Sequence, residues 1–378
     1  MLIKRTFPLL SAILMAFLLS GCTPISPAVS SASPSPISQA GASPTVTPDA
    51  PVIPDGAWLE VRFLDVGQAD AVLVRCDGEA MLLDGGNVAD SSLIVAVLKE
   101  LNVERLTYVV NSHPHEDHVG GLAGALNVCA AGHVYSSTDN YDSEAFRDFK
   151  RYAETQGRQI ELPKAGDTWS LGEATVKVLG PVRDYEETNN TSLVLRLDYG
   201  QTSFLFTGDM EREAEQDLLT VVGEAELNCD VLKVGHHGSE TSTSYPFLRA
   251  VMPEYGIISV GADNSYGHPE EAILSRLGDA GVQVYRTDLQ GDVIATSDGR
   301  TVTVTTEKVA KPQVPPVTSQ PFTTPETALA GAYIGNKKSE VFHLPSCKNL
   351  PAEKNRIWFD SREEAVSAGF RPCGNCNP

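Results

Sequence analysis

The chain has 378 residues, of which 29 are Lys or Arg and 49 are Asp or Glu, so its formal net charge at pH 7 is −20. A hydrophobic content of 42% and an aromatic content of 7% are ordinary for a globular protein and allow a sizeable core, which excludes a chain that is disordered throughout. Proteins that bind along nucleic acid backbones usually present a basic surface. The excess of acidic residues argues against such a surface over this chain as a whole.

The first 22 residues have the composition of a signal peptide. Lys4 and Arg5 precede an apolar run over residues 9–19, which is too short for a stable membrane span. The run ends in Leu19-Ser-Gly-Cys22, which resembles a bacterial lipobox, so we expect Cys22 to be acylated and to become the mature N-terminus. A cleaved secretory signal with an incidental Cys22 is the alternative. Both alternatives predict that the protein is located in the bacterial cell envelope, either lipid-anchored on the outer face of the cytoplasmic membrane or secreted.

Composition divides the rest of the chain into four segments. Residues 23–56 are dense in Ser, Pro, Thr and Ala with almost no charge, which predicts a disordered tether. Residues 307–331 are Pro- and Thr-rich and predict a second linker. Between them, residues 57–306 form the predicted catalytic domain, and residues 332–378 form a separate small tail. No further apolar run is long enough to cross a membrane, so we expect contact with the membrane through the Cys22 anchor only, with no transmembrane channel.

Strands and amphipathic helices alternate along the catalytic domain, as in a layered α/β fold. Short apolar or alternating runs predict strands over residues 58–64, 71–75, 80–83, 106–111, 193–197, 203–207, 229–234, 282–285, 292–296 and 301–305. Helical periodicity predicts helices over residues 89–101, 122–126, 144–155 and 272–277. The segment Cys76-Asp-Gly-Glu79 predicts a tight hairpin between the second and third strands.

A cluster of histidines follows the fourth strand, in the loop Asn111-Ser-His-Pro-His-Glu-Asp-His-Val-Gly-Gly121. His113 and His115 stand two residues apart in an extended loop, so their side chains can converge on one ion. Asp117 and His118 follow one turn later and can hold a second ion, because imidazole nitrogens and carboxylate oxygens are ligands of catalytic Zn, Mn and Fe. Three of the eight histidines lie in this loop, which favours a metal site over a solvated polar loop.

Two later loops carry further ligand-type residues. Asp209 follows an apolar strand and is well placed to bridge two cations. His236 and His237 follow a buried strand, and because adjacent side chains diverge, one should complete the second metal site while the other meets the substrate. We assign His236 as the ligand and His237 as the substrate-side group.

Two histidines stand apart from these loops. His268 lies ahead of a helix and is either a substrate-side or metal-side group or an ordinary helix-entry residue. His133 has no ligand-type neighbour, so we expect a packed or surface side chain.

The loop from His113 to His118 resembles the metal-binding loop His-x-His-x-Asp-His of the metallo-β-lactamase superfamily. More narrowly, four segments resemble the soluble domain of ComEC-type competence proteins: Phe63-Leu-Asp-Val-Gly-Gln-Ala-Asp-Ala71, Leu82-Leu-Asp-Gly-Gly86, Phe206-Thr-Gly-Asp209 and Lys233-Val-Gly-His-His-Gly-Ser239. The resemblance covers about residues 57–306 and implies a four-layer αββα metallo-β-lactamase fold. It also implies that Asp84 orients the metal loop through hydrogen bonds without binding metal, in a role that a buried carboxylate suits.

The expected ligand sets share one bridging carboxylate, that of Asp209. The second metal would be held by Asp117, His118, Asp209 and His236, and the first by His113, His115 and Asp209. The wider superfamily usually supplies a further histidine to the first metal between His133 and His236, where this chain has Asn189-Asn-Thr-Ser192, a variant that the competence-type members share. Water or an oxygen of Asn190 or Ser192 would take that place, and such an oxygen-rich site makes Mn²⁺ a rival of Zn²⁺.

Two adjacent divalent ions lower the pKa of a shared water and polarise an ester oxygen, so the predicted reaction is metal-assisted hydrolysis. The main hypothesis is a phosphodiesterase or nuclease that uses a dinuclear-metal hydroxide, because the ComEC soluble domain is implicated in nuclease action. Asp117 would be essential, and His237, His268 or metal-bound water would protonate the leaving oxygen.

The substrate is open between DNA and other phosphodiesters. Residues 57–306 contain 18 Lys and Arg against 40 Asp and Glu, a balance of −22 whose field repels a polyanion. The second hypothesis is therefore a phosphodiesterase of envelope polymers, such as choline- or glycerol-phosphate groups, or of small phosphodiesters. The third is a catalytically silent metal-binding surface module that presents its tail to a protein partner.

The tail carries four ligand-type residues of tetrahedral zinc type: His343, Cys347, Cys373 and Cys376. So short a chain can hardly build a core, so one structural Zn²⁺ should supply its folding energy, with a disulfide between Cys373 and Cys376 or free thiols as the alternative. The segments Tyr333-Ile-Gly-Asn336, Val341-Phe-His343 and Phe370-Arg-Pro-Cys373 resemble the zinc-binding module of Ada-type DNA repair proteins. That family has a Cys where this chain has His343, and alkyl transfer requires a thiolate, so the resemblance implies a structural or binding role. The tail has 7 basic and 5 acidic residues, so its charge does not repel nucleic acid, which modestly favours DNA as the substrate.

The three remaining cysteines, Cys76, Cys129 and Cys229, are scattered in apolar contexts. We expect them to be thiols in the core, although the sequence leaves a disulfide among them open.

Overall fold

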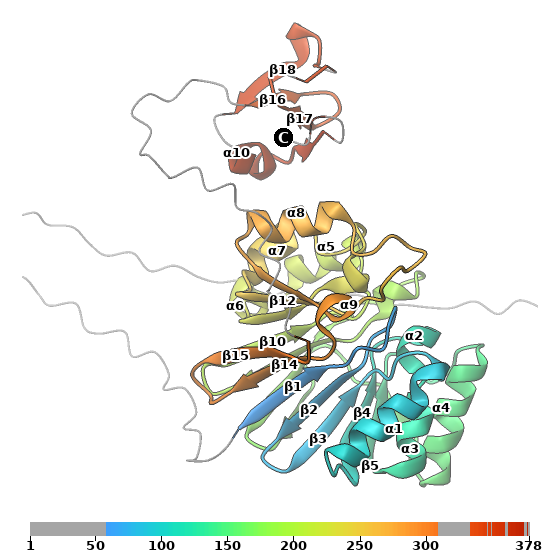
Figure 1. The fold of residues 1–378 in the computed structure, drawn as a ribbon. Coiled ribbons are helices and arrows are strands. Elements are labelled where there is room, and N and C mark those ends of the chain that lie inside the picture. Colours follow the sequence, from blue (N-terminus) through green and yellow to red (C-terminus); the bar gives the residue numbers. More distant parts are fainter. Residues whose placement is uncertain are drawn as a thin grey trace, which may run out of the picture. The chain divides into compact units, whose positions relative to one another are not determined.

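The computed structural model describes residues 58–308 and residues 333–378, the latter apart from Ser346, Asn349, Asp360, Ser361, Gly374, Asn375, Asn377 and Pro378 (Figure 1). The predicted signal peptide with Cys22, the tether and the linker lie outside the described residues. The catalytic domain and the tail are described one by one below.

Two β-sheets form the centre of the catalytic domain. The first has the order β15-β14-β1-β2-β3-β4-β5-β6 and consists of β1 (Leu59–Phe63), β2 (Val72–Cys76), β3 (Glu79–Leu83), β4 (Arg105–Asn111), β5 (Ala130–Ser136), β6 (Ile160–Glu161), β14 (Val293–Ser297) and β15 (Val302–Thr306). The second has the order β13-β12-β11-β10-β9-β8-β7 and consists of β7 (Thr168–Leu171), β8 (Ala174–Gly180), β9 (Val194–Tyr199), β10 (Thr202–Phe206), β11 (Val231–Lys233), β12 (Tyr255–Ile258) and β13 (Gln283–Arg286).

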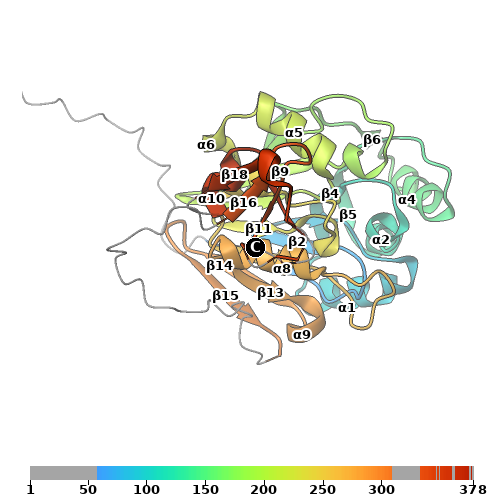
Figure 2. The same ribbon diagram turned by 90° about the horizontal axis from the view of Figure 1, so that it is seen from above.

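Helices cover the outer face of each sheet (Figure 1). On the first sheet lie α1 (Ser91–Glu100), α3 (Leu122–Val128) and α4 (Glu144–Thr155), with the single turn α2 (Glu116–Val119) and the 3₁₀ turn η1 (Val88–Asp90) at its edge. On the second lie α5 (Arg212–Val221), α6 (Glu224–Leu227), α7 (Tyr245–Val251) and α8 (Glu271–Asp279). The short α9 (Thr287–Gln290) and the 3₁₀ turns η2 (Asn189–Thr191) and η3 (Gly235–Gly238) lie in loops. The turned view shows α1, α2 and α4 together on one side of the domain (Figure 2).

Alternation along the strands builds the layers. In β2 the side chains of Val72 and Val74 point into the core between the sheets, and that of Leu73 points to the helices on the other face. In β10 Phe204 and Phe206 point into the same central core, and Leu205 faces the helices of the second sheet. Because the side-chain period of a strand is two, each sheet buries both faces, and the result is the predicted four-layer αββα architecture.

The predicted strands and helices of the catalytic domain are all present, with ends within two residues of those predicted. The hairpin between β2 and β3 is also confirmed, since Cys76 pairs with Glu79 and the two loop residues, Asp77 and Gly78, have φ values of 49° and 88°. Positive φ at both loop positions gives a turn whose twist matches that of the strands.

The loop that carries the histidines packs tightly against the loop after β3. A Cβ on Gly121 would overlap the carbonyl oxygen of Gly85, and a Cβ on Gly120 would overlap the backbone of Asn87 and Val88. Neither neighbour is a flexible side chain, so the backbones can approach this closely only where both positions are glycine.

We therefore expect Gly121→Ala to lower the free energy of unfolding by about 1–3 kcal/mol, because the added methyl group must displace backbone. Denaturant unfolding followed by circular dichroism measures the change. Gly223→Ala is the matched control, since a Cβ there meets nothing within 4 Å. An equal, small effect of both substitutions would contradict the tight contact.

The tail forms a four-stranded sheet in the order β18-β16-β17-β19. It consists of β16 (Tyr333–Asn336), β17 (Val341–His343), β18 (Arg356–Phe359) and β19 (Arg371–Pro372), with α10 (Arg362–Ser367) and the 3₁₀ turn η4 (Glu353–Asn355). Among the described residues of the tail, a small buried apolar cluster consists of Phe342, Phe359 and Ala365, with partly buried side chains around it. So small a core supports the prediction that a metal supplies folding energy.

Candidate metal centre

Four strand ends deliver the candidate site. In the first sheet β3 and β4 are parallel, and Asp84 and His113 come directly after them. In the second sheet β10 and β11 are parallel, and Asp209 and the two adjacent histidines come after those. The carboxyl ends of parallel neighbours meet at one edge, so residues as far apart in sequence as Asp84 and His237 converge there.

Four side chains gather most closely: Asp117, His118, Asp209 and His237. Their potential ligand atoms all lie within 4.8 Å of one another. His118 Nε2 is 3.3 Å and His237 Nε2 3.5 Å from Asp209 Oδ2, and His237 Nε2 is also 3.4 Å from Asp117 Oδ2. Three buried atoms of this cluster, His118 Nε2, His237 Nε2 and Asp209 Oδ1, have no hydrogen-bond partner in the described structure. Buried nitrogen and oxygen atoms that lie close together without hydrogen-bond partners can serve as ligands of a divalent cation.

Neighbouring groups fix which ring nitrogen of each histidine is available. His118 Nδ1 lies 2.9 Å from Asp84 Oδ2, and His237 Nδ1 lies 3.0 Å from the carbonyl oxygen of Ser259. Since a carboxylate and a carbonyl can only accept, each Nδ1 carries a hydrogen, and each Nε2 is the nitrogen that faces the cluster and would bind a metal ion in place of a proton. This is the arrangement that metal-ligating histidines use.

Asp84 is held by the loop it orients. Its carboxylate accepts hydrogen bonds from the Ser112 backbone N–H at 2.7 Å and the Ser112 hydroxyl at 2.7 Å, besides the one from His118. It is 2% exposed and its φ is +58°, in the left-handed region. Burial raises the pKa of the Asp84 carboxyl, and His118 opposes that effect. Asp84 therefore lies in contact with the ligand loop and outside the group of four clustered residues.

The electrostatics of the cluster favour a cation. Burial lowers the pKa of His118, but the surrounding carboxylates outweigh it and raise that pKa well above the usual value. Burial likewise raises the pKa of Asp209, and the neighbouring histidines more than reverse this, so the group stays ionised. Carboxylates that attract a proton to His118 also attract a metal ion, and the residues present therefore fit the divalent cation that the histidine loop predicts.

His113 and His115 lie beside this cluster. His113 Nε2 faces His115 Nδ1 at 3.0 Å, so the two nitrogens converge as the sequence spacing predicts. The rings of His113 and His118 are 4.1 Å apart between centroids. Burial lowers the pKa of His113 well below its usual value, which keeps the ring in the neutral form that binds metal.

The loop that replaces the further histidine of the superfamily has a structural role at two of its positions. Asn190 Oδ1 accepts a hydrogen bond from the backbone N–H of Glu211 at 2.9 Å, and Ser192 Oγ accepts one from that of Asp209 at 3.1 Å. Both oxygens thus hold the loop that carries Asp209, and the prediction that water or one of them completes the first metal site stays a prediction. Asn189 lines the site pocket instead, and its buried Oδ1 has no partner in the described structure.

Of the two adjacent histidines, His237 is a member of the group of four, whereas His236, which the sequence analysis assigned as the ligand, lies beside it. His236 is partly exposed, with Nε2 3.7 Å from Asp209 Oδ2 and Nδ1 3.3 Å from Glu211, and it is not one of the four clustered residues. His237 is 2% exposed and belongs to the cluster. Both have positive φ, 51° and 53°, and this rare backbone form aims adjacent side chains at the same region.

His268 lies at the rim. It lines a pocket of about 340 Å³ together with the residues Gln68, His115, Glu116, Asp117, Asn189, Asp209, His236, His237 and Tyr266. Its ring centroid is 5.7 Å from that of His236, and burial lowers its pKa. His133 lies elsewhere, on β5, where it pairs with Glu161 at 2.9 Å on the surface.

Two charged residues behind the site were not singled out from the sequence. Asp70 and Lys233 are each 2% exposed, and Lys233 Nζ lies 2.7 Å from Asp70 Oδ2. Asp70 Oδ1 is in turn 3.6 Å from His237 Nδ1. Both residues stand in the ComEC-like segments, but no spacing rule pairs positions 163 residues apart, so only the fold reveals the ion pair.

The three scattered cysteines of the catalytic domain are buried free thiols, as expected. Burial raises the pKa of Cys76 to about 12 and raises that of Cys229 as well. Since the thiolate is the reactive form, these side chains act as apolar core residues.

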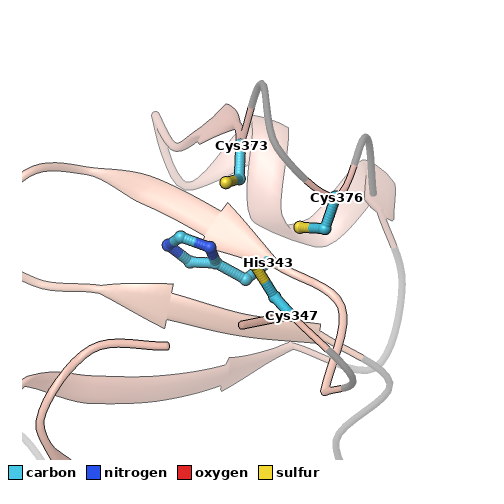
Figure 3. A group of neighbouring side chains, drawn as sticks. All are labelled: His343, Cys347, Cys373 and Cys376. Atoms are coloured by element: carbon cyan, nitrogen blue, oxygen red, sulfur yellow. The ribbon is translucent and has the colours of Figure 1, made fainter. Parts of the chain in front are cut away.

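In the tail, His343, Cys347, Cys373 and Cys376 offer ligand atoms within 4.8 Å of one another. Figure 3 shows the sulfur atoms of Cys373 and Cys376 on the same side of the sheet as the His343 ring. His343 Nδ1 is buried without a partner in the described structure, and burial lowers the pKa of the ring. The set fits a tetrahedral Zn²⁺.

We expect Cys376→Ala to remove one zinc per chain and to unfold the tail, because the metal supplies most of its folding energy. Elemental analysis together with the loss of the tail's dispersed NMR signals measures both effects. Cys129→Ala, which removes a buried thiol outside the cluster, should leave the zinc count unchanged. A full zinc count in the Cys376 variant would refute the assignment.

Comparison with known proteins agrees with this geometry. Residues 64–262 match the Metallo-beta-lactamase superfamily and residues 323–378 match the metal binding domain of Ada. The chain therefore belongs to the metallo-β-lactamase superfamily, is a metallo-hydrolase by family, and carries an Ada-like zinc-binding domain. Both resemblances seen in the sequence are confirmed, as is the likeness to ComEC-type competence proteins.

Three of the relatives that match this chain carry the names of a ComE operon protein, a competence protein and a recombination protein. ComE operon protein 3 of Bacillus subtilis (strain 168) is 31% identical in an alignment of 260 positions that covers 62% of this chain and 32% of the relative. Competence protein ComA of Neisseria gonorrhoeae is 35% identical over 61% of this chain and 31% of its own length. Recombination protein 2 of Haemophilus influenzae is 31% identical over 62% of this chain and 28% of its own length. The chain thus spans about a third of the length of these curated relatives.

Among solved structures, the metallo-β-lactamase fold protein YhfI of Bacillus subtilis aligns with a TM-score of 0.45 at 12% identity, over 64% of this chain and all of that one. No helix in residues 58–308 or in the described part of the tail is long and apolar enough to cross a membrane.

Proposed function

We propose that this chain is a metal-dependent phosphodiesterase of the bacterial cell envelope that hydrolyses DNA strands. The observation that carries the proposal is the set Asp117, His118, Asp209 and His237, of which the last three are buried, and in which hydrogen bonds to Asp84 and Ser259 leave both Nε2 atoms for a cation. When bound, a pair of divalent ions, Zn²⁺ or Mn²⁺, would activate water and polarise the phosphate, which is the chemistry that two-metal sites supply to phosphodiesters.

The chain's own residues would have distinct roles. Asp209 would be the carboxylate shared by the two metal sites, and its buried Oδ1, which has no partner in the described structure, supports a ligand role. His237 completes the second site, a role the sequence assigned to His236. His236 and His268 line the pocket and face the position of a substrate. His268 lines the pocket outside the metal cluster and would pass a proton to the leaving oxygen.

DNA is favoured as the substrate by two indirect observations. One relative is named a competence protein and another a recombination protein. The tail has 7 basic against 5 acidic residues and could approach a polyanion that the acidic catalytic domain repels. The proposed place is the outer face of the membrane, with Cys22 as the anchor, and a protein partner of the tail is not specified.

A side-by-side assay tests the substrate. The full chain in mild detergent is given single-stranded DNA or bis-p-nitrophenyl phosphate, with Zn²⁺ or Mn²⁺, and Asp117→Ala is the control. Metal-dependent cleavage of DNA that vanishes in the variant is the expected result. Turnover of the small diester alone would favour envelope phosphodiesters, the second candidate that the acidic domain supports. Activity in neither assay with full metal content would favour a silent binding module.

A further inference from the structure

An exposed tyrosine stands at the rim of the metal pocket. Tyr266 lines the pocket of about 340 Å³ together with Asp117, Asp209 and His237. It is 72% exposed, more than any other large hydrophobic side chain in the described part of the chain. A tyrosine left in water beside a catalytic pocket offers a large apolar face to whatever enters.

The loop of Tyr266 is fixed by one side chain. Asn264 Oδ1 accepts hydrogen bonds from the backbone N–H groups of Tyr266 at 3.1 Å and His268 at 3.0 Å. Asn264 Nδ2 donates to the carbonyl oxygens of Gly261 at 2.9 Å and His268 at 2.6 Å. Gln68 joins the other side of the loop, since its Oε1 accepts from the Gly261 N–H at 3.1 Å. The position of Tyr266 is therefore organised before any ligand binds.

A row of rings leads from the metal cluster to this tyrosine. The Tyr266 ring stacks on that of His268, with centroids 5.7 Å apart and an angle of 25° between the planes. His268 is 5.7 Å from His236, whose Nε2 is 3.7 Å from Asp209 Oδ2. A flat ring that lies against Tyr266 would thus stand at the same pocket that Asp117, Asp209 and His237 line.

The lining distinguishes between two kinds of aromatic recognition. A quaternary ammonium group such as choline is held by a cage of several aromatic faces. Among the residues that line this pocket, Tyr266 is the one aromatic side chain that is not a histidine. A single stacked ring suits a planar group, and every nucleobase presents a face that can stack, whatever its sequence.

We propose that Tyr266 is a stacking platform for the nucleobase next to the scissile phosphodiester, so that the site prefers nucleic acid strands over phosphodiesters without bases. This inference rests on the proposed phosphodiesterase function. It makes Tyr266 a residue that determines specificity, and it accounts for selection of DNA by a domain whose charge disfavours it.

The test compares two single strands of equal length and charge: oligothymidylate and an oligonucleotide of abasic tetrahydrofuran units. The measured quantity is the ratio of kcat/KM values for the two strands, with their affinities measured in parallel by fluorescence anisotropy of labelled strands. We expect the wild-type chain to favour oligothymidylate by about 5- to 150-fold. Tyr266→Ala should bring the ratio close to one, and Tyr266→Phe should keep it. Val221→Ala, an exposed residue of α5 that does not line the pocket, is the control.

The outcomes separate the two claims. Cleavage of both strands at equal rates, or a ratio that Tyr266→Ala leaves unchanged, overturns the platform while the phosphodiesterase stands. Absence of cleavage with an affinity preference that Tyr266→Ala abolishes supports the platform and refutes hydrolysis. Absence of both cleavage and preference refutes both.

Discussion

Replacement of Lys233 by methionine should lower the free energy of unfolding by about 3–5 kcal/mol, the cost of leaving one member of a buried ion pair without its partner. Lys233 and Asp70 are each 2% exposed and lie 2.7 Å apart, and the Lys233 ammonium also donates to the Val234 carbonyl oxygen at 2.9 Å. Methionine fills a similar volume, so the loss would come from the charge on Asp70 and not from a cavity. Urea unfolding of the two proteins measures the difference.

The double variant Asp70→Asn, Lys233→Met separates the charge from the packing. Because it removes both charges, we expect it to recover a large part of the stability that the single change loses. Lys177→Met serves as the surface control, since its ion pair with Glu226 is exposed and should contribute at most about 1 kcal/mol. A loss below 1 kcal/mol for Lys233→Met would show that Asp70 is not held as a buried carboxylate.

Asp209→Asn should reduce kcat/KM by about 10³-fold, the equivalent of roughly 4 kcal/mol of lost stabilisation of the transition state. The carboxylate is 2% exposed, lies 3.3 Å from His118 Nε2 and 3.5 Å from His237 Nε2, and one of its oxygens is buried without a partner. The asparagine side chain has nearly the same size as that of aspartate but lacks the negative charge that offsets a cation. The metal content should therefore fall together with the activity.

Elemental analysis and initial rates on the same samples measure both effects. Asp263→Asn is the matched control, because Asp263 lies in an exposed part of the loop before Tyr266 and outside the cluster. If Asp209→Asn kept its metal and its activity, Asp209 would not be a ligand.

Much of the fold follows from local pattern. Turn chemistry and hydrophobic periodicity depend on residues that are close in the sequence. They predict the hairpin at Asp77-Gly78, the alternation in β2 and the helix over Glu144–Thr155. The sequence predicts the two histidine loops as metal-binding loops for the same reason, because their ligand-type residues are close together in the sequence.

Residues that act through space were harder to predict. The ion pair of Asp70 and Lys233 joins two sheets, and no local signal links them. The choice between His236 and His237 depends on two successive positive φ values, which periodicity rules for strands and helices do not describe. Asn190 and Ser192 were plausible metal oxygens by composition, but their hydrogen bonds to the Asp209 loop are a property of the folded backbone.

Titration of metal into the metal-free chain, with hydrolysis of a single-stranded oligonucleotide as the readout, tests the central claim most directly. With the wild-type chain, whose tail takes one Zn²⁺, we expect activity to rise with added Mn²⁺ or Zn²⁺ and to saturate once two equivalents beyond that one are bound per chain. Activity that does not depend on metal, or metal that binds without any hydrolysis, would contradict the account.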